Sequence, residues 1–269
     1  MGETSLHHSA VVVTMDKDFV ERLQKISLTE EEETDIAVRV NHRRETLEEC
    51  SLSMIGRFLC EKTLNLRAAK SLLRSVWRMG SDLRIVEVGT GLLQFKFLLE
   101  SQMKWVEDNG PWSFDNHLLV LRRWEKGMSA LNVSFPSIRL WVQMWGLPFD
   151  LMNEEAGKGI GSAMGKVMDV DGKAIAAEQA RFLRVRIEIP LDKPLRRGAP
   201  VVNPEGDRSW VAFRYERIVG FCYSCGRLGH DMKICPHRCS STKPSESTDN
   251  PYGEWLKAGG RQGTGGPRE

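Results

Sequence analysis

The chain has 269 residues, of which 41% are hydrophobic and 28% are charged, and its formal net charge is only +2. This length and apolar content suffice for one to three folded domains. No apolar stretch approaches the roughly 20 residues of a membrane-spanning helix, so we expect no membrane partner. Four of the six cysteines cluster with metal-ligand spacing and no secretory leader precedes them, which favours a reducing intracellular compartment.

The charges are distributed unevenly along the chain. Residues 1–50 hold 12 acidic against 6 basic side chains and include four consecutive glutamates. We predict a mostly flexible acidic arm there, with a short helix around residues 19–26 and ordered structure from near Ser51. Residues 181–239 hold 12 basic against 6 acidic side chains, which favours a polyanionic partner for that part.

Residues 51–127 predict one compact domain with the element order β-α-β-β-α-β. The apolar side chains of its first helix recur at i, i+3, i+4, i+7 and i+8, with Asn65 as N-cap and Gly80 as the stop. These apolar positions are Ala69, Leu72, Leu73, Val76 and Trp77. Strands are expected at 54–59, 83–88, 92–97 and 117–124, and a second helix at 102–108. The fold class is therefore α+β, a split-βαβ (ferredoxin-like or RNA-recognition-like) domain.

The third strand of this domain decides whether it carries the base-stacking surface of an RNA-recognition motif. Alternation places Leu93, Phe95 and Phe97 on one face of the strand, and more polar side chains on the other. We favour core packing over base stacking for Phe95 and Phe97. The domain is then RNA-recognition-like in fold but lacks the stacking platform.

Residues 128–218 predict a second α+β unit. Strands are expected at 138–144, 166–170, 181–189 and 210–215, and a helix at 153–164. Arg181, Arg184 and Arg186 line one side of the long strand in this interpretation, and phosphate contact and a solvated face both remain open for them. Gly157, Gly159 and Gly161 lack the register of a dinucleotide-binding loop, and two glutamates precede them, so nucleotide binding is not expected there. We expect no small-molecule substrate.

The sequence from 219 to 239 carries the strongest motif. Cys222, Cys225, His230 and Cys235 stand at C-x2-C-x4-H-x4-C spacing, which supplies four ligands for a closed tetrahedral Zn²⁺ site. So short a segment depends on metal binding for its folding free energy. Cys239, and less readily His237, lies close enough in sequence to replace one of the four ligands.

Around these ligands, four further side chains are candidates for nucleic-acid contact. Tyr223 and Met232 offer a small apolar surface to an unstacked base, although packing inside the knuckle is the alternative. Arg227 and Lys233 are expected to contact phosphate or a base edge. Beyond the knuckle, residues 240–269 are rich in Ser, Thr, Pro and Gly, and we predict a disordered tail.

Several segments of the chain resemble one protein family: 56–59, 65–79, 110–114, 119–124, 141–148, 180–186, 193–197 and 215–222. The family is the plant domain of unknown function that precedes a CCHC zinc knuckle in first-open-reading-frame proteins of LINE-type retrotransposons and their genomic derivatives. The resemblance runs from about residue 25 to 239. It implies nucleic-acid binding, packaging or chaperoning of a retroelement RNA, and residence in the nucleus.

These observations together predict a zinc-dependent protein that binds single-stranded RNA or DNA. The chain contains no nucleophile elbow, P-loop or other catalytic signature, so we expect no enzymatic activity. The alternatives are a protein-interaction scaffold, with self-association of the upstream domains, or a degenerate retroelement-derived fragment without binding activity.

Overall fold

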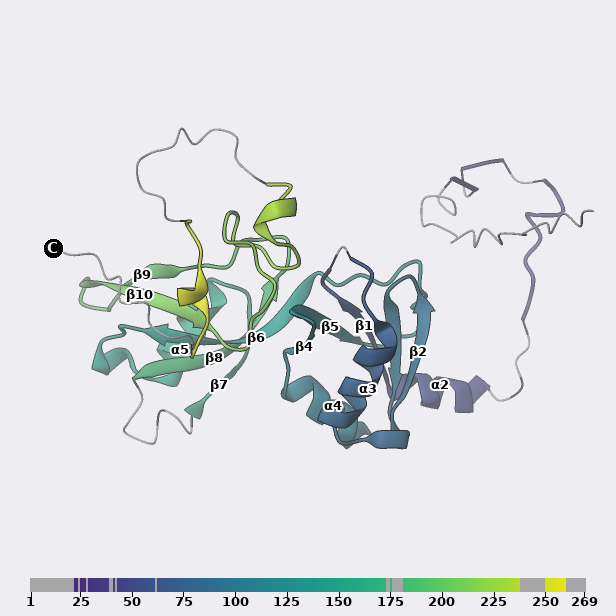
Figure 1. Cartoon of the computed structure of the whole chain (residues 1–269), viewed down its shortest axis with the longest axis horizontal. Coiled ribbons are helices and arrows are strands. Elements are labelled where there is room, and N and C mark those ends of the chain that lie inside the picture. Colours follow the sequence, from purple (N-terminus) through teal and green to yellow (C-terminus); the bar gives the residue numbers. More distant parts are fainter. Residues whose placement is uncertain are drawn as a thin grey trace, which may run out of the picture.

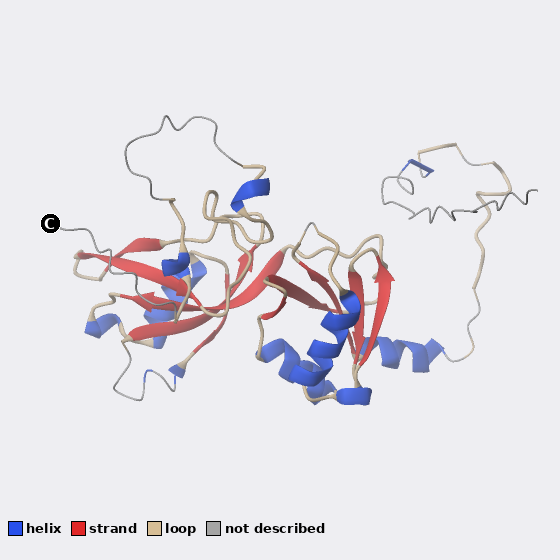
Figure 2. Cartoon of the chain, in the orientation of Figure 1, coloured by secondary structure: helices blue, strands red, loops and turns tan. Residues whose placement is uncertain are grey.

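The structure, a computed structural model, contains two five-stranded antiparallel sheets with helices packed against them (Figures 1 and 2). None of the helices among the described residues combines the length and the apolar character needed to span a membrane. The described residues are 22–23, 25–27, 29–38, 41, 43–60, 62–172, 175, 181–237 and 250–259.

The first sheet has the topology that the split-βαβ prediction requires. Its strands are β1 (Ser53–Phe58), β2 (Arg84–Gly89), β3 (Leu92–Lys96), β4 (Trp112–Phe114) and β5 (His117–Arg123). They lie in the order β2-β3-β1-β5-β4, so that β1 and β3 occupy the centre. The helices are α3 (Leu66–Val76) and α4 (Glu100–Asp108), with the short 3₁₀ helix η1 (Gly80–Asp82) before β2. The predicted fold class is confirmed, and β4 is an addition to it.

Helix α3 begins where the sequence predicted, but its buried face is narrower than predicted. The Asn65 side chain accepts a hydrogen bond of 3.0 Å from the backbone N–H of Ala68, as an N-cap should. Ala69, Leu73 and Trp77 are buried in the core. The prediction is wrong for Leu72 and Val76, which are 43% and 44% exposed. A helix that meets a sheet along one line buries only the residues nearest that line.

The aromatic side chains of Phe95 in β3 and of Phe97, which directly follows the strand, face the helices, as expected. Phe95 and Phe97 are buried, and the Trp77 ring lies between 5.4 and 6.2 Å from theirs, centroid to centroid. The opposite face of the sheet is partly covered by the connection after β5, where Ala130 Cβ lies 3.3 Å from the position of a Cβ on Gly89. The first sheet therefore has no exposed aromatic platform on β3.

Strand β5 belongs to both cores of the molecule. Leu119 packs into the cluster under α3 and α4. Leu118 and Val120, which alternate with it, pack into the cluster of the second sheet. Because successive side chains of a strand point to opposite faces, one strand can serve two cores.

The second sheet is built from β6 (Ser137–Trp145), β7 (Lys166–Val170), β8 (Phe182–Pro190), β9 (Gly198–Val202) and β10 (Arg208–Tyr215). Their order is β7-β8-β6-β10-β9. The 3₁₀ helix η2 (Phe149–Leu151) and the helix α5 (Glu154–Ser162) connect β6 to β7. Strand β9 was not predicted from the sequence, because Gly198 and Pro200 are typical of loops. It is an edge strand, where a proline is tolerated.

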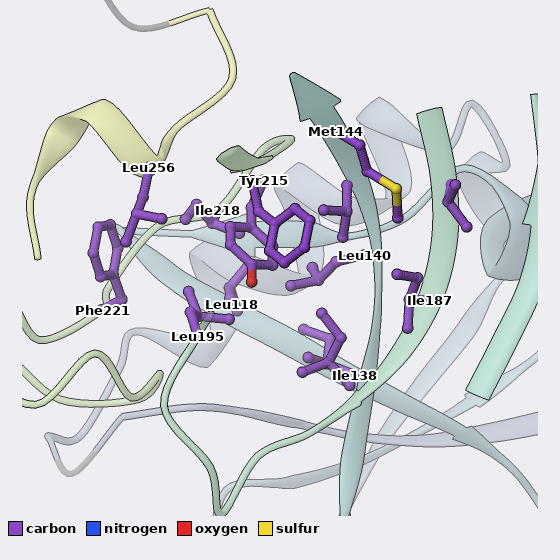
Figure 3. Packing of buried hydrophobic residues seen from close by; sticks show 14 of the residues in the cluster. Leu118, Ile138, Leu140, Met144, Ile187, Leu195, Tyr215, Ile218, Phe221 and Leu256 are labelled. Atoms are coloured by element: carbon purple, nitrogen blue, oxygen red, sulfur yellow. The ribbon is translucent and has the colours of Figure 1, made fainter. Parts of the chain in front are cut away.

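One face of the second sheet forms a continuous apolar core with the elements packed on it (Figure 3). On β6 every second side chain is buried: Ile138, Leu140, Val142 and Met144. Helix α5 approaches this face closely because it has glycines there. A Cβ on Gly157 would lie 2.9 Å from Leu183 Cδ2, and one on Gly161 would lie 2.7 Å from Val167 Cγ2. These glycines therefore serve helix–sheet packing.

Two of the arginines on β8 make contacts that the sequence did not predict. Arg184 pairs with Asp171 and Glu216 at 2.9 and 2.8 Å, and its guanidinium lies 3.9 Å from the centroid of the Trp141 ring. Arg186 is 8% exposed and pairs with Asp108 at the end of α4. These two side chains are therefore neither fully solvated nor free to bind phosphate, because both are ion-paired within the chain. Arg181 precedes β8 and is exposed.

The two sheets are also joined by a polar contact at the end of α4. Glu107 pairs with Arg123 of β5 at 2.8 Å and with Arg139 of β6. Its backbone oxygen accepts a hydrogen bond from Arg186 of β8. Burial by itself would raise the pKa of the Glu107 carboxyl, but the hydrogen bonds from Arg123 and Arg139 bring this pKa below its ordinary value of 4.5.

Regular structure begins earlier than expected at the N-terminal side. Helix α2 (Arg43–Ser51) precedes β1, so the boundary near Ser51 was placed too late. Lys96 of β3 pairs with Glu49 of this helix at 2.9 Å. Of the short helix predicted at 19–26, residues 22 and 23 are helical, and residues 19–21 and 24 lie outside the described residues.

The tail prediction is wrong for residues 250–259. They contain the 3₁₀ helix η4 (Glu254–Leu256), and Leu256 is fully buried in the core of the second sheet (Figure 3). The backbone N–H of Ala258 donates a hydrogen bond of 2.9 Å to the backbone oxygen of Tyr215. The preceding residue, Lys257, forms a parallel β-bridge with Tyr215. Residues 240–249 and 260–269 lie outside the described residues.

We expect Leu256→Ala to lower the free energy of unfolding by about 2–5 kcal/mol, because it removes a fully buried side chain from a packed core. Denaturant titration monitored by circular dichroism would measure this. Trp255→Ala is the matched control, since that neighbouring side chain is 50% exposed and should cost less. Equal unfolding curves for Leu256→Ala and the unmodified protein would show that the segment is not docked.

We expect the protein to lose stability on acidification partly through Glu107. A carboxyl whose pKa is lowered in the folded state stabilises the fold above its unfolded pKa, near 4.5. That contribution disappears as the pH falls through the lowered folded value. Glu107→Gln should therefore be less stable at neutral pH and lose less stability between pH 6 and about 3. Glu48→Gln, at an exposed carboxylate of α2, should change the curve less. An unchanged slope for Glu107→Gln would contradict this assignment.

Candidate metal centre

The segment that follows β10 forms a small knuckle whose backbone is held by its own hydrogen bonds. An isolated antiparallel bridge joins Phe221 to Leu228. The N–H of Cys222 donates to the oxygen of Arg227 at 2.9 Å, and the N–H of Gly226 returns to the oxygen of Cys222 at 2.8 Å. These bonds close a tight loop, so the first two cysteines are presented from its two ends.

Two glycines of the knuckle are required by its backbone conformation. Gly226 has φ of 74° and Gly229 has φ of 94°, both in the left-handed region that other residues rarely adopt. A Cβ on Gly226 would also lie 2.4 Å from the ring of Tyr252. The positions of the glycines in the sequence therefore reflect the turns on either side of the ligand loop.

The four predicted metal ligands come together in the structure. Their ligand atoms, the Sγ atoms of Cys222, Cys225 and Cys235 and a ring nitrogen of His230, all lie within 4.8 Å of one another. The Cys225 Sγ and His230 Nε2 atoms are 3.2 Å apart. In a tetrahedral zinc site, ligand atoms are separated by roughly 3.5–3.8 Å. The observed cluster is close to that size, and three thiols with one imidazole are a donor set that zinc prefers.

The electrostatic surroundings of the thiols also suit a cation. Burial raises the pKa of the Cys225 thiol, and the neighbouring Cys235 and Cys222 sulfurs raise it further, against an opposing backbone hydrogen bond from Arg227. Thiolates gathered so closely repel one another unless a positive charge lies between them. A bound divalent cation supplies that charge and displaces the thiol protons.

The alternative ligands predicted from the sequence are placed differently. His237 does not belong to the cluster, and its Nε2 lies 2.7 Å from the Arg227 guanidinium. Cys239 lies outside the described residues. Within the part of the chain that the structure describes, the four-residue cluster is the one group of His, Cys, Asp and Glu side chains arranged to hold a metal ion.

The last ligand is positioned by a short 3₁₀ helix, η3 (Met232–Ile234). The Asp231 side chain caps it by accepting a hydrogen bond of 2.8 Å from the N–H of Lys233. Met232 and Ile234 are 36% and 42% exposed, and Lys233 is exposed as well. Two of the predicted nucleic-acid contacts therefore lie on one exposed turn, together with an apolar side chain that was not predicted.

Tyr223, expected to meet a base, is engaged in contacts within the chain. Its ring centroid lies 4.9 Å from that of Phe221, and its hydroxyl donates a hydrogen bond to Glu254 of η4. Burial raises the pKa of Tyr223 to about 12, and Glu254 adds to the increase, so the hydroxyl remains a donor at neutral pH. Of the two roles predicted for Tyr223, packing within the chain fits these contacts better than an exposed ring that is free to meet a base.

Residues outside the motif hold the knuckle against both sheets. A Cβ on Gly220 would lie 2.6 Å from the oxygen of Asn116, in the turn between β4 and β5. The N–H of Leu195 donates to the oxygen of Gly226 at 2.9 Å. Tyr252 covers Gly226 on another side. Sequence reasoning missed these residues, although Tyr252, Trp255 and Leu256 were a signal as large apolar side chains in an otherwise polar tail.

Comparison with known proteins matches two segments of the chain. A family described as a domain of unknown function (DUF4283) matches residues 46–131, and a zinc knuckle family matches residues 189–237. An uncharacterized protein from Arabidopsis thaliana is 33% identical over 131 residues, which is 48% of this chain and 40% of that protein. The chain thus spans less than half of that relative's length. It carries a DUF4283 domain followed by a zinc knuckle.

Proposed function

We propose that this protein binds single-stranded RNA or DNA through a knuckle folded around one zinc ion. The observation that carries the proposal is the convergence of Cys222, Cys225, His230 and Cys235, whose ligand atoms lie within 4.8 Å of one another. The match of residues 189–237 to a zinc knuckle supports zinc as the metal. Zinc knuckles are among the common modules that recognise unpaired nucleic acid.

The proposed role of zinc is structural. Four protein ligands complete a tetrahedron, and no position remains for an activated water, so we propose a binding protein without enzymatic activity. The metal fixes the two glycine turns and the η3 turn in one arrangement. Without it, the knuckle has few apolar contacts of its own to keep that arrangement.

The proposed contact surface is the exposed side of the knuckle. Met232 and Ile234 of η3 offer apolar surface to an unstacked base, and Lys233 between them offers a charge to phosphate. Arg227 stands on the neighbouring turn beside His237. Tyr223 joins this surface only if its hydroxyl leaves Glu254, so we assign it a smaller part in the initial contact.

Two wider aspects belong to the same proposal. The basic side chains of residues 181–239, apart from the ion-paired Arg184 and Arg186, favour a polyanionic partner. The resemblance to LINE-type first-open-reading-frame proteins supports a retroelement origin and action in the nucleus. The Arabidopsis relative is described as uncharacterized, so its description does not indicate a binding partner.

We expect Cys235→Ser to lose its zinc and to bind single strands at least about tenfold more weakly, since the η3 turn depends on that ligand. Metal analysis and fluorescence anisotropy with labelled oligouridine and oligodeoxythymidine would measure both effects. Cys50→Ser is the matched control, because that thiol lies on α2, and it should keep zinc and affinity. Loss of zinc with unchanged affinity would refute the knuckle as the binding site. Stable zinc without any affinity in the unmodified protein would favour a protein-interaction scaffold.

We expect Lys233→Ala to weaken binding to all single-stranded sequences alike and to reduce the slope of log affinity against log salt by about 1. The reason is that an exposed lysine meeting phosphate releases one condensed counterion. Titrations from 50 to 200 mM salt would measure the slope. Lys126→Ala, in the exposed turn after β5, should leave it unchanged. Identical slopes for the two variants would exclude Lys233 from the interface.

A further inference from the structure

The second sheet has two faces of different character. The face that carries Val211 and Phe213 is buried in the core under α5 and the C-terminal segment. The other face carries aromatic and basic side chains along the same strands. We call its outer end the Trp210 face, and it is formed by Trp145, Phe182, Arg208, Trp210 and Arg214.

The aromatic side chains of the Trp210 face are held in place by contacts within the sheet. The rings of Trp145 and Phe182 lie side by side, with centroids 4.7 Å apart and planes tilted by 35°. The Arg214 guanidinium lies 5.0 Å from the centroid of the Trp145 ring. A Cβ on Gly198 would lie 2.7 Å from the indole of Trp210, so that ring lies across the glycine. Trp210 nevertheless remains 63% exposed.

The spacing of these side chains suits successive unstacked bases. Ala212 is directly opposite Trp145, which places Trp210 and Arg214 on the two diagonals from that tryptophan. Diagonal neighbours on one face of an antiparallel pair are about 7–8 Å apart. Ala212, which lies between Trp210 and Arg214 on this face, has only a methyl side chain.

The charges on this sheet face differ between its two ends. At the inner end, Arg184 is neutralised by Asp171 and Glu216, and Arg186 pairs with Asp108. At the Trp210 face, Arg208 and Arg214 form no ion pair with any carboxylate among the described residues. The nearby Asp207 is hydrogen-bonded to Asn203. Positive charge is therefore available beside the exposed ring of Trp210.

We infer that the Trp210 face is a second binding surface for single-stranded nucleic acid. This inference rests on the proposed function and extends it from the knuckle to the sheet. The exposed ring of Trp210 can stack on any base, beside the half-buried rings of Trp145 and Phe182. Arginines without a carboxylate partner can contact phosphate, and the two contacts together give sequence-tolerant binding. A duplex keeps its bases stacked on one another, so the rings select single strands. The first sheet offers no equivalent on β3, because Phe95 and Phe97 are buried.

The test compares Trp210→Ala with the unmodified, zinc-loaded full chain. Anisotropy titrations use labelled oligouridine and oligodeoxythymidine of about 20 nucleotides, long enough for both surfaces. We expect Trp210→Ala to lose at least about fivefold in affinity, the smallest effect typical of one stacked base. Trp210→Phe, which keeps a ring, should recover most of it. Trp105→Ala removes an indole of comparable exposure, 43%, from α4 of the other unit and should bind normally.

Zinc content and circular dichroism show whether each variant keeps its fold. Folded Trp210→Ala with unchanged affinity would overturn the inference, and the knuckle proposal would stand if Cys235→Ser still loses binding. Loss of affinity in Trp210→Ala alone, with Cys235→Ser unaffected, would support the sheet surface and refute the knuckle. A Trp210→Ala that binds oligonucleotides normally but no longer self-associates would identify the face as a protein contact instead. Absence of binding by the unmodified chain would refute both.

Discussion

Both cores of the molecule depend on the alternation of side chains along β5. Leu119 completes the core beneath α3 and α4, and Leu118 and Val120 complete the core of the second sheet. Displacing this strand from the first sheet would therefore also open the core of the second sheet. The DUF4283 domain and the sheet that leads into the knuckle are therefore packed as neighbours, with Glu107 and its arginine partners adding a polar contact at the same junction. The turn before β5 also supports the knuckle through the close approach of Asn116 to Gly220.

The sequence predicted those features that depend on neighbouring residues. The Asn65 cap, the inward Phe95 and Phe97, and the spacing of the four ligands are local patterns with a direct physical meaning. What escaped prediction depends on distant partners. The sequence left phosphate contact possible for Arg184 and Arg186. In the structure Arg184 pairs with Glu216 and Arg186 with Asp108, both far away in sequence. Strand β9 was missed because its glycine and proline suggest a loop, whereas pairing with β10 makes it an edge strand. The burial of Leu256 was missed because residues 240–269 are mostly polar or glycine, a composition that indicates disorder.

The two sheets differ in where the aromatic side chains of their central strands lie. In the first sheet the rings of Phe95 and Phe97, in and directly after β3, face inward and pack around Trp77. The connection after β5 partly covers the other side. In the second sheet the core is almost entirely aliphatic on β6 and β8, and the large rings stand on the face away from it. A resemblance to RNA-recognition folds would direct attention to the first sheet. The exposed Trp210 and the arginines Arg208 and Arg214, which have no carboxylate partner, instead direct it to the second.

The docked position of Leu256 has a practical consequence for dissecting the protein. A fragment that stops directly after the knuckle would retain all four cluster residues, yet it would leave the apolar surroundings of Phe221 and Tyr215 open to water. Such a fragment would be prone to aggregate for reasons unrelated to coordination chemistry. Poor behaviour of a truncated knuckle should therefore be attributed first to the uncovered core, and boundaries for shorter versions are better drawn beyond residue 259.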